Sequence, residues 1–217
     1  MREFFNHCVT DAEYKREIQR KLFHILTIIF LPLLYIFLSK KHILMIIFPL
    51  SLLIIATDFY RHKIPQLELI FRKAFGHILR DTELAQNSWT GASYMAMAAM
   101  IIFTICPKSI AICAFSILAV SDCLAALVGK KMTSKEFFEK SIAGSITFGV
   151  SAILILIICG LFTHQGLAYY FFGAFAVFAT TIIEARPSFF SIDDNLTIPL
   201  TFATVMMFFG LVWNLHY

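Results

Sequence analysis

Seven long apolar runs constrain the fold of this chain more than any other feature of its sequence. Each run holds about 17 to 20 residues, the length that an α-helix needs to cross the hydrocarbon core of a bilayer. Because lipid offers no partners to backbone N–H and C=O groups, segments of this length and character form helices. The predicted spans are 22–38, 43–59, 89–106, 109–128, 142–161, 167–184 and 196–214.

The composition also indicates a membrane protein. Hydrophobic residues make up 59% of the chain and charged residues only 15%, whereas soluble domains have about 25% charged residues. The first 21 residues are polar, unlike a cleaved signal peptide, and the five cysteines form no C-x-x-C pair, so we expect neither disulfides nor structural zinc. We therefore predict an all-α integral membrane protein, a single polytopic domain over residues 1–217. Its surroundings are membrane lipids rather than nucleic acid, and the sequence leaves its oligomeric state open.

Charge sorts the segments between these spans into two sets. Fifteen of the 18 Lys and Arg residues, and all 14 acidic residues, fall on or nearest to one side. The positive-inside rule makes this side cytoplasmic, with the N-terminus inside and the C-terminus outside, in a cytoplasmic or endoplasmic-reticulum-type membrane. We expect the polar chemistry there, in the N-terminal segment 1–21, the interfacial loop 60–88 and the candidate active-site loops 129–141 and 185–195.

A charged strip leads into the first span. Glu17, Lys21 and His24 fall at i, i+4 and i+7, with Arg20 beside them, so they share one helix face. One interpretation is a positive-inside anchor with a Glu–Lys pair. The other is a cationic strip that reaches an anionic ligand.

The loop between the second and third spans has its own periodicity. Apolar residues from Leu67 to Ile78 recur at i, i+3 and i+4, which predicts an amphipathic helix in the membrane interface, either a surface anchor or a wall for a lipid substrate. Arg80 and Glu83 follow at i and i+3 and are expected to pair. Asp58, at the end of the second span, fits a solvated helix terminus equally well.

One acid lies inside an apolar span. Asp122 is followed by Gly129, Lys130 and Lys131, and Lys140 comes nine residues later. A carboxylate within a span costs about 2.5–3.5 kcal/mol at the bilayer centre, so it usually marks a site. An acid that can hold Mg²⁺, next to cations that can hold phosphate oxygens, indicates a nucleotide-phosphate site at a membrane surface.

Small and acidic residues extend this pattern. Ser141, Gly144 and Ser145 open the fifth span at helical spacing, which fits either helix packing alone or packing combined with phosphate contact. In the last loop, Glu184 ends one span, and Asp193, Asp194 and Asn195 precede the next. One of these is expected as an N-cap, and the clustering of the acids favours a hard-cation site.

In this order the residues resemble the motifs of the CTP-dependent lipid-alcohol kinases. This family includes dolichol kinase, phytol kinase, CTP-dependent diacylglycerol kinase and compact bacterial polyprenol kinases. The resemblance covers nearly the whole chain and rests on Glu17-x-x-Arg20-Lys21-x-x-His24, Arg80-x-x-Glu83, Asp122-x-x-Ala125 with Gly129, Lys140-Ser141-x-x-Gly144-Ser145, Glu184 and Asp194-Asn195-x-x-x-Pro199.

The resemblance implies transfer of the γ-phosphoryl group of CTP to the hydroxyl of a polyprenol, dolichol, diacylglycerol or phytol-like alcohol. It assigns Asp122, Gly129 and residues 140–145 to the CTP site, and Arg20 and Lys21 to an essential cationic pair.

Two residues depart from the family pattern. Ser121 stands where the family usually has Gly, and Ala143 where Glu is common. A metal ligand or base would then have moved to Glu139 or to the last loop.

The resulting hypothesis combines Mg²⁺ or another divalent cation with CTP as co-substrate. The predicted catalytic residues are Asp122, Lys140, Arg20, Lys21 and Glu184, and one acid or His24 accepts the hydroxyl proton. The predicted nucleotide-binding residues are Gly129, Lys130, Lys131, Lys140, Ser141, Gly144, Ser145 and Asn195. The predicted metal ligands are Asp122, Glu184, Asp193 and Asp194. The predicted supporting residues are Glu17, His24, Arg80 and Glu83.

Three alternatives stay open. A phosphatidate cytidylyltransferase also uses CTP in membranes, although the basic, His-Gly-Gly-containing C-terminal signature of that family is absent here. A transporter also uses intramembrane acids. A purely structural membrane protein would lose only stability when these polar residues are neutralised.

Overall fold

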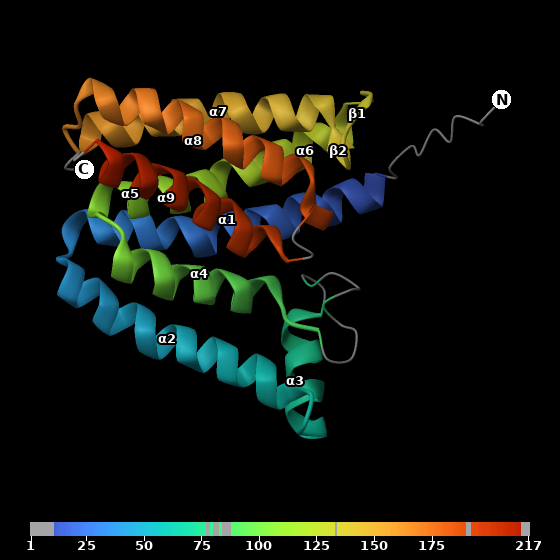
Figure 1. The fold of residues 1–217 in the computed structure, drawn as a ribbon. Coiled ribbons are helices and arrows are strands. Elements are labelled where there is room, and N and C mark those ends of the chain that lie inside the picture. Colours follow the sequence, from blue (N-terminus) through green and yellow to red (C-terminus); the bar gives the residue numbers. More distant parts are fainter. Residues whose placement is uncertain are drawn as a thin grey trace.

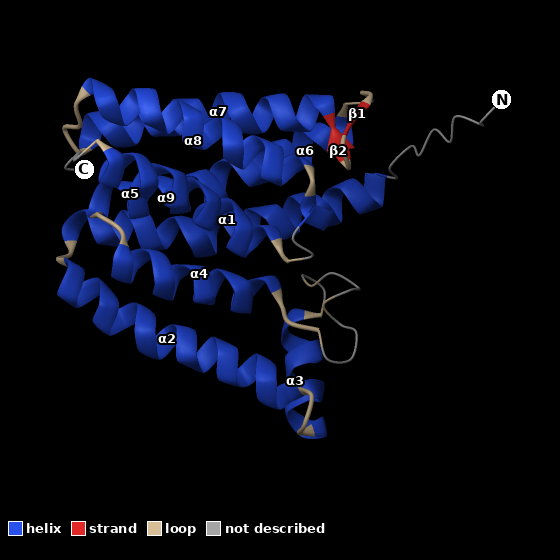
Figure 2. Ribbon diagram, in the orientation of Figure 1, coloured by secondary structure: helices blue, strands red, loops and turns tan. Residues whose placement is uncertain are grey.

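The computed structural model describes residues 11–76, 79, 83, 88–132, 134–189 and 192–213. Figures 1 and 2 show a bundle of long helices with one small pair of strands at one end. The helices are α1 (Asp11–Phe37), α2 (Lys40–Arg61), α3 (Pro65–Phe75), α4 (Gly91–Ile105), α5 (Lys108–Ser116), α6 (Asp122–Lys131), α7 (Ile142–Phe162), α8 (Leu167–Ala185) and α9 (Asp194–Val212).

The predicted all-α membrane fold is confirmed. In the described part of the chain, six helical segments are long and apolar enough to span a membrane, and α4 is a shorter apolar helix. Their outward faces carry large apolar side chains, among them Leu26, Phe30 and Leu53, each more than half exposed. Such a surface suits a lipid environment.

One span forms the centre of the bundle. Helices α5 and α6 are joined by the π-helical turn η1 (Ile117–Ser121) into a continuous helix from Lys108 to Lys131. This helix is the most deeply buried span, and it packs on α1, α7 and α9. The π-helical turn ends at the residue before Asp122, and such turns occur frequently at functional sites.

The other helices pack around this centre in two groups. Helix α8 packs on both α7 and α9, whereas α2 packs on α4, and α4 in turn packs on α9. Figure 1 shows that α1, α7 and α9 begin at the same end of the bundle where α6 and α8 end. The polar segments predicted to converge therefore do lie at one end, and Lys40, Lys41 and Lys108 lie at the starts of α2 and α5 at the other.

Helix α3 occupies the predicted amphipathic segment. It starts with Pro65 at its first turn and ends at Phe75, with Gly76 as its C-cap, and none of its residues is buried. The prediction extended to Ile78, which lies outside the described residues. Its position at a membrane interface stays a prediction.

Asp58 was interpreted as a solvated helix terminus, and this interpretation is wrong. Asp58 is 3% exposed and accepts hydrogen bonds from Arg61 Nε at 2.6 Å, from the Thr90 backbone N at 2.7 Å and from Ser93 Oγ at 2.6 Å. Arg61 is itself 0% exposed. The carboxylate thus joins the end of α2 to the start of α4, because a buried charge needs a partner and hydrogen bonds.

A short hairpin with two residues in each strand leads into α7. Strand β1 (Glu136–Phe137) pairs antiparallel with β2 (Lys140–Ser141), and Phe137 is opposite Lys140. Phe138 in the turn has φ 57°, the left-handed region. The Glu139 backbone N donates to Ala185 O at 3.1 Å, so the hairpin is attached to the end of α8. This contact holds Lys140 close to the last turn of α8.

Candidate active site

A buried ion pair joins the first helix to the central one. Lys21 Nζ donates to Asp122 Oδ2 at 2.5 Å, and His24 Nε2 lies 3.5 Å from the same oxygen. Lys21 is 3% exposed and Asp122 6%. Two charges this deep are stable only when they face each other, so this pair fixes α1 against α6.

Glu17 does not pair with Lys21, contrary to the anchor interpretation. Its carboxylate accepts from Arg20 Nη2 at 2.5 Å and from Lys130 Nζ at 2.7 Å. Glu17 is buried, so the pair with Lys130 ties α1 to the last turn of α6. Lys21 pairs with Asp122 instead, and the binding of an anionic ligand by this strip stays a prediction.

Lys140 lies between two acids from different helices. Its Nζ donates to Glu184 Oε1 at 2.6 Å and to Asp194 Oδ2 at 3.0 Å. Burial lowers the pKa of Lys140, but the carboxylates of Asp194, Glu184 and Asp122 outweigh burial and raise that pKa well above its ordinary value. The lysine is therefore a fixed positive charge that connects the hairpin, α8 and α9.

These pairs surround a cavity of about 360 Å³, within the size range of small-molecule sites. We call it the polar cavity. Its lining brings together most of the predicted site residues, from five helices and the hairpin: Glu17, Arg20, Lys21, Asp122, Gly129, Lys130, Lys140, Ser141, Gly144, Glu184 and Asp194. Glu139, named as a substitute for the missing family Glu, also lines it.

The small residues of the wall let two helices cross closely. A Cβ added to Gly144 would lie 3.0 Å from Ala125 O and 3.4 Å from Gly129 Cα. Ser141 caps α7 by accepting from the Gly144 backbone N at 3.1 Å. The predicted helix packing at these small residues is present, with α6 as the partner of α7, and phosphate contact at these residues stays a prediction.

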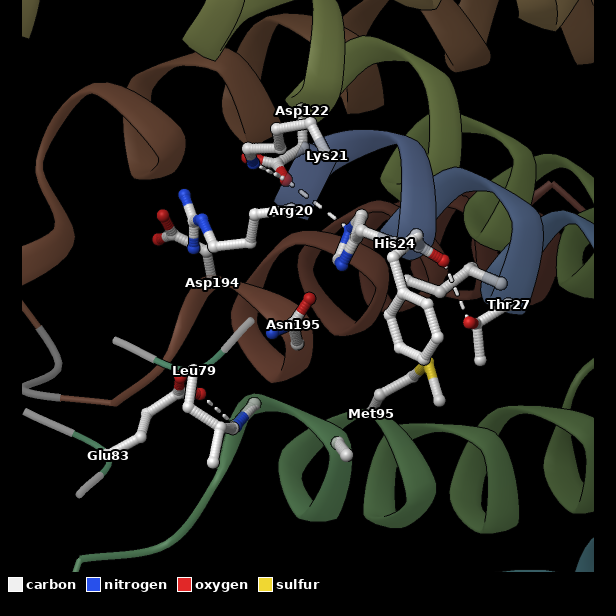
Figure 3. A pocket seen from close by; sticks show the side chains of 14 residues that line it. Arg20, Lys21, His24, Thr27, Leu79, Glu83, Met95, Asp122, Asp194 and Asn195 are labelled. Carbon is white, nitrogen blue, oxygen red and sulfur yellow. Dashed lines mark hydrogen bonds and ion pairs between the residues drawn. The ribbon is translucent and has the colours of Figure 1, made fainter. Parts of the chain in front are cut away.

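A second cavity, of about 130 Å³, lies on the other side of the Lys21–Asp122 pair. We call it the α1/α4 cavity, and Figure 3 shows His24 extending into it from α1, with Met95 of α4 and Asn195 of α9 on its other walls. Glu83 also lines it and accepts from the Gly91 backbone N at 2.6 Å. The two cavities share four residues: Arg20, Lys21, Asp122 and Asp194.

Some predicted site residues lie elsewhere. Lys131 is exposed and lines neither cavity. Ser145 lines an apolar groove between α7 and α8. Asp193 caps α9, since its Oδ1 accepts from the Asn195 backbone N at 2.9 Å and from Asn195 Nδ2 at 2.6 Å. Arg80 lies outside the described residues, so its predicted pair with Glu83 stays a prediction.

Two sets of atoms could hold a metal ion. In the described part of the chain, His24, Asp122 and Cys123 bring one ligand atom each to within 4.8 Å of one another. Separately, Glu184 Oε2 and Asp194 Oδ1 are buried and accept no hydrogen bond from any described residue. The second set, all oxygen, suits a hard cation such as Mg²⁺, whereas the thiol of the first suits a softer metal.

Three features of the site have no signal in the sequence. The hairpin that places Lys140 has strands of two residues each, too short for a period-2 pattern. Ala92 and Met95, which line the α1/α4 cavity, are apolar like the residues of any lipid-facing surface. The pair of Glu139 with the Ser188 hydroxyl and backbone N depends on the approach of segments 49 residues apart.

The fold and the site together define an all-α integral membrane protein with buried ion pairs gathered at one end of its bundle. The chain is 34% identical over 194 residues to a protein of Rickettsia prowazekii (strain Madrid E) named "Uncharacterized protein RP860", an alignment that covers 88% of this chain and 93% of that one. The chain therefore belongs to the same family as this rickettsial protein.

A more distant relative has a named activity. The chain is 26% identical over 167 residues to "CTP-dependent diacylglycerol kinase 1" of Saccharomyces cerevisiae, which covers 74% of this chain and 55% of the yeast enzyme. No protein-family model matches the chain, and no solved structure matches it significantly. The distant similarity is to a lipid kinase, in agreement with the resemblance of the motifs.

Proposed function

We propose that this protein transfers the γ-phosphoryl group of CTP to the hydroxyl of a membrane lipid alcohol. The observation that carries the proposal is the polar cavity, which is lined by the cations Lys140, Lys130 and Arg20 together with the carboxylates of Asp122 and Glu184, and which adjoins the α1/α4 cavity with its apolar residues. Phosphoryl transfer depends mainly on positioning and charge neutralisation, and this cavity offers both. The distant similarity to a CTP-dependent diacylglycerol kinase supports the choice of nucleotide and acceptor class.

The donor atoms fit a magnesium ion. Mg²⁺ is usually bound by one or two carboxylates together with substrate phosphates, and Glu184 Oε2 and Asp194 Oδ1 are buried oxygens with no hydrogen bond from any described residue. These two residues would hold the ion, and Asp193 is less suited because one of its oxygens caps α9. When bound, Mg²⁺ supplies positive charge on the phosphate oxygens.

The cations of the cavity have separate tasks. Lys140 bridges Glu184 and Asp194, and its ammonium group would add a positive charge beside the phosphates to those of Lys130 and Arg20. Lys130 and Arg20 are both held by Glu17, which orients them toward the polar cavity. Such preorganised charges stabilise a transition state because they need no rearrangement as the reaction proceeds.

The transfer itself forms one bond and breaks one. The lipid hydroxyl oxygen bonds to the γ-phosphorus, and the bond from that phosphorus to the β,γ-bridging oxygen breaks, so that CDP leaves. The hydroxyl proton goes to the Asp122 carboxylate, which the Lys21 ammonium holds in place at 2.5 Å. A base within hydrogen-bonding reach of the acceptor is what this chemistry requires.

A transfer assay with purified protein in detergent micelles tests the proposal. It compares CTP, ATP, GTP and UTP with a C20 isoprenoid alcohol, a long polyprenol and dioctanoylglycerol as acceptors. We expect phosphorylated lipid with CTP, lost on chelation with EDTA and restored by Mg²⁺. The variants Glu184→Gln and Asp194→Asn should raise the Mg²⁺ requirement by at least about tenfold, the lower end of what losing a metal's supporting partner costs.

Lysine substitutions provide a matched comparison. Lys140→Met should lower kcat by about 10²–10³, as the loss of one preorganised charge-stabilising donor does in other enzymes. Lys135→Met, in the same loop but with an exposed side chain, should leave kcat unchanged. Equal effects of the two substitutions, or no transfer from any nucleotide to any of the alcohols, would overturn the proposal.

A further inference from the structure

The lining of the α1/α4 cavity combines polar and apolar residues. Its lining includes the Asp122 carboxylate and His24, and also the apolar side chains of Phe23, Ile28 and Met95. Phe23 is 46% exposed on the outward face of α1. A carboxylate together with apolar side chains, one of which reaches a lipid-facing surface, matches a molecule with one hydroxyl and a hydrocarbon chain.

The packing of the helices leaves a way into this cavity from the side. Helix α1 packs on α5 and α6, whereas α4 packs on α2 and α9. Figure 3 shows His24 of α1 and Met95 of α4 on opposite sides of the cavity. The two helices contact each other nearer their other ends, where the ring centroids of Tyr35 and Phe103 lie 5.1 Å apart. A lipid could enter between these helices without leaving the apolar phase.

On this basis, and resting on the proposed function, we infer that the α1/α4 cavity is the acceptor site and that Ala92 and Met95 limit the girth of the alcohol near its hydroxyl. The polar cavity then takes the nucleotide, and the Lys21–Asp122 pair is the wall between them. Phosphorus and hydroxyl oxygen would meet at Asp122, which lines both.

The size of the α1/α4 cavity restricts which part of the alcohol it can bind. Its volume of about 130 Å³ is close to that of an engineered protein cavity of about 150 Å³ that binds benzene. Only the hydroxyl and the first few carbons fit, and the rest of the lipid stays in the bilayer. The protein should therefore discriminate alcohols by their bulk near the hydroxyl and not by chain length.

Two other hollows suit the acceptor less well. The α7/α8 groove, about 590 Å³, is lined by residues such as Ile146, Val150 and Phe178, and none of its lining residues is titratable. A groove between α1, α5 and α7 has His164 and Lys108 at the opposite end of the bundle from Asp122. Neither brings a hydroxyl to the carboxylate.

A size series at Ala92 tests the inference. Ala92 lines the cavity and is exposed, so larger side chains can enter it without repacking the core. We expect Ala92→Ser to retain activity, and Ala92→Leu and Ala92→Phe to lower kcat/KM for the alcohol by at least about tenfold, since misplacing a substrate by about 1 Å can cost 10²-fold. Binding of α-labelled CTP with Mg²⁺, measured by equilibrium dialysis, should be unchanged, which also reports that the variants fold.

Matched controls separate the possible outcomes. Ile101→Phe on the lipid-facing side of α4 and Val150→Phe in the α7/α8 groove should leave kcat/KM for the alcohol unchanged. Met95→Ala should widen the range of accepted alcohols, including dioctanoylglycerol relative to a C20 isoprenoid alcohol. Transfer that Ala92→Phe leaves intact, or that Val150→Phe abolishes, would overturn this inference and leave the proposed function standing.

Photo-crosslinking gives a second readout that does not depend on turnover. An isoprenoid alcohol with a diazirine two or three carbons from its hydroxyl should label peptides of α1 or α4, and excess unlabelled alcohol should compete. Labelling confined to α7 or α8 would overturn the inference. Absence of transfer by the unsubstituted protein from every nucleotide would instead overturn the proposed function itself.

Discussion

Neutralising Asp122 should damage the protein in two separable ways. Lys21 is 3% exposed, and among the described residues Asp122 is the carboxylate within ion-pair distance of it. The substitution Asp122→Asn removes that negative charge and leaves the buried ammonium group in place. Removing one partner of a buried pair costs about 3–5 kcal/mol, because the other charge is left unpaired. For a chain of this length each kcal/mol corresponds to about 2–4 °C, so the unfolding temperature should fall by about 6–20 °C.

A double variant distinguishes the structural loss from the catalytic one. In Asp122→Asn/Lys21→Met neither charge remains, so much of the lost stability should return, with a coupling energy within the usual range of about 0.5–3 kcal/mol for residues in contact. Transfer activity should stay absent in both variants. Unfolding can be followed on heating in detergent by the reaction of buried thiols such as Cys123 with a fluorogenic maleimide.

Two results would refute this reasoning. If Asp122→Asn were as stable as the unsubstituted protein, the Lys21–Asp122 pair would not hold α1 against α6. If the double variant regained both stability and transfer activity, Asp122 would be a structural residue and not part of the reaction.

Three further predictions concern the surroundings of the site. Asp58→Ala removes the carboxylate that accepts from the fully buried Arg61 at 2.6 Å and leaves Glu68 Oε2 at 3.6 Å from Arg61 Nη1, so it should lower the free energy of unfolding by about 1–3 kcal/mol, and an unchanged unfolding temperature would contradict this. In Gly144→Val, Cβ alone would lie 3.0 Å from Ala125 O, so the substitution should lower the free energy of unfolding by about 1–3 kcal/mol and weaken binding of labelled CTP. Unchanged stability and CTP binding would show that the close crossing of α6 and α7 is not required. Because neighbouring carboxylates raise the pKa of Lys140 despite its burial, its stabilising effect should be complete below the unfolded-state pKa of about 10.4 and lost only as the pH rises through the higher folded-state value. The difference in unfolding temperature between the protein and Lys140→Met should therefore be the same at about pH 6 and pH 9, and a difference that disappeared by pH 9 would show that the folded-state pKa of Lys140 lies below its ordinary value.

The helices could be predicted from the sequence because the signal for a membrane span is local. The seven apolar runs correspond to six long apolar segments and the shorter α4, and the acid at 122 indicated a site because a carboxylate is costly within a span. The sequence also indicated that the polar segments would converge at one end. These inferences need only the composition of each run and the order of the charges.

The partners of the charges could not be predicted in the same way. Lys21 and Asp122 are 101 residues apart, and the local pattern favoured a pair between Glu17 and Lys21 instead. At Asp58 the neighbouring Arg61 was visible in the sequence, but burial of both depends on the start of α4, where Thr90 N, Thr90 Oγ1 and Ser93 Oγ all donate to Asp58. Pair choice depends on how the helices pack, and a single sequence carries no record of that packing.

The two cavities could not be predicted from the sequence either. The residues of the polar cavity were predicted one by one, but their division between a nucleotide side and an acceptor side depends on the position of one wall, the Lys21–Asp122 pair. The apolar lining of the α1/α4 cavity has the same composition as the lipid-facing surface of any span. Which apolar residues face a cavity depends on how α1 and α4 pack in the folded protein.

The most direct test of the central claim is the fate of the label in CTP. Purified protein with Mg²⁺ and a lipid alcohol in micelles is given CTP labelled either at the γ-phosphate or at the α-phosphate, and the lipid extract is counted. This account predicts label in the lipid from γ-labelled CTP, none from α-labelled CTP, and none from either in Asp122→Asn. Label from the α-phosphate would instead indicate cytidylyl transfer, and absence of label in the lipid from both would contradict an enzymatic role for the site.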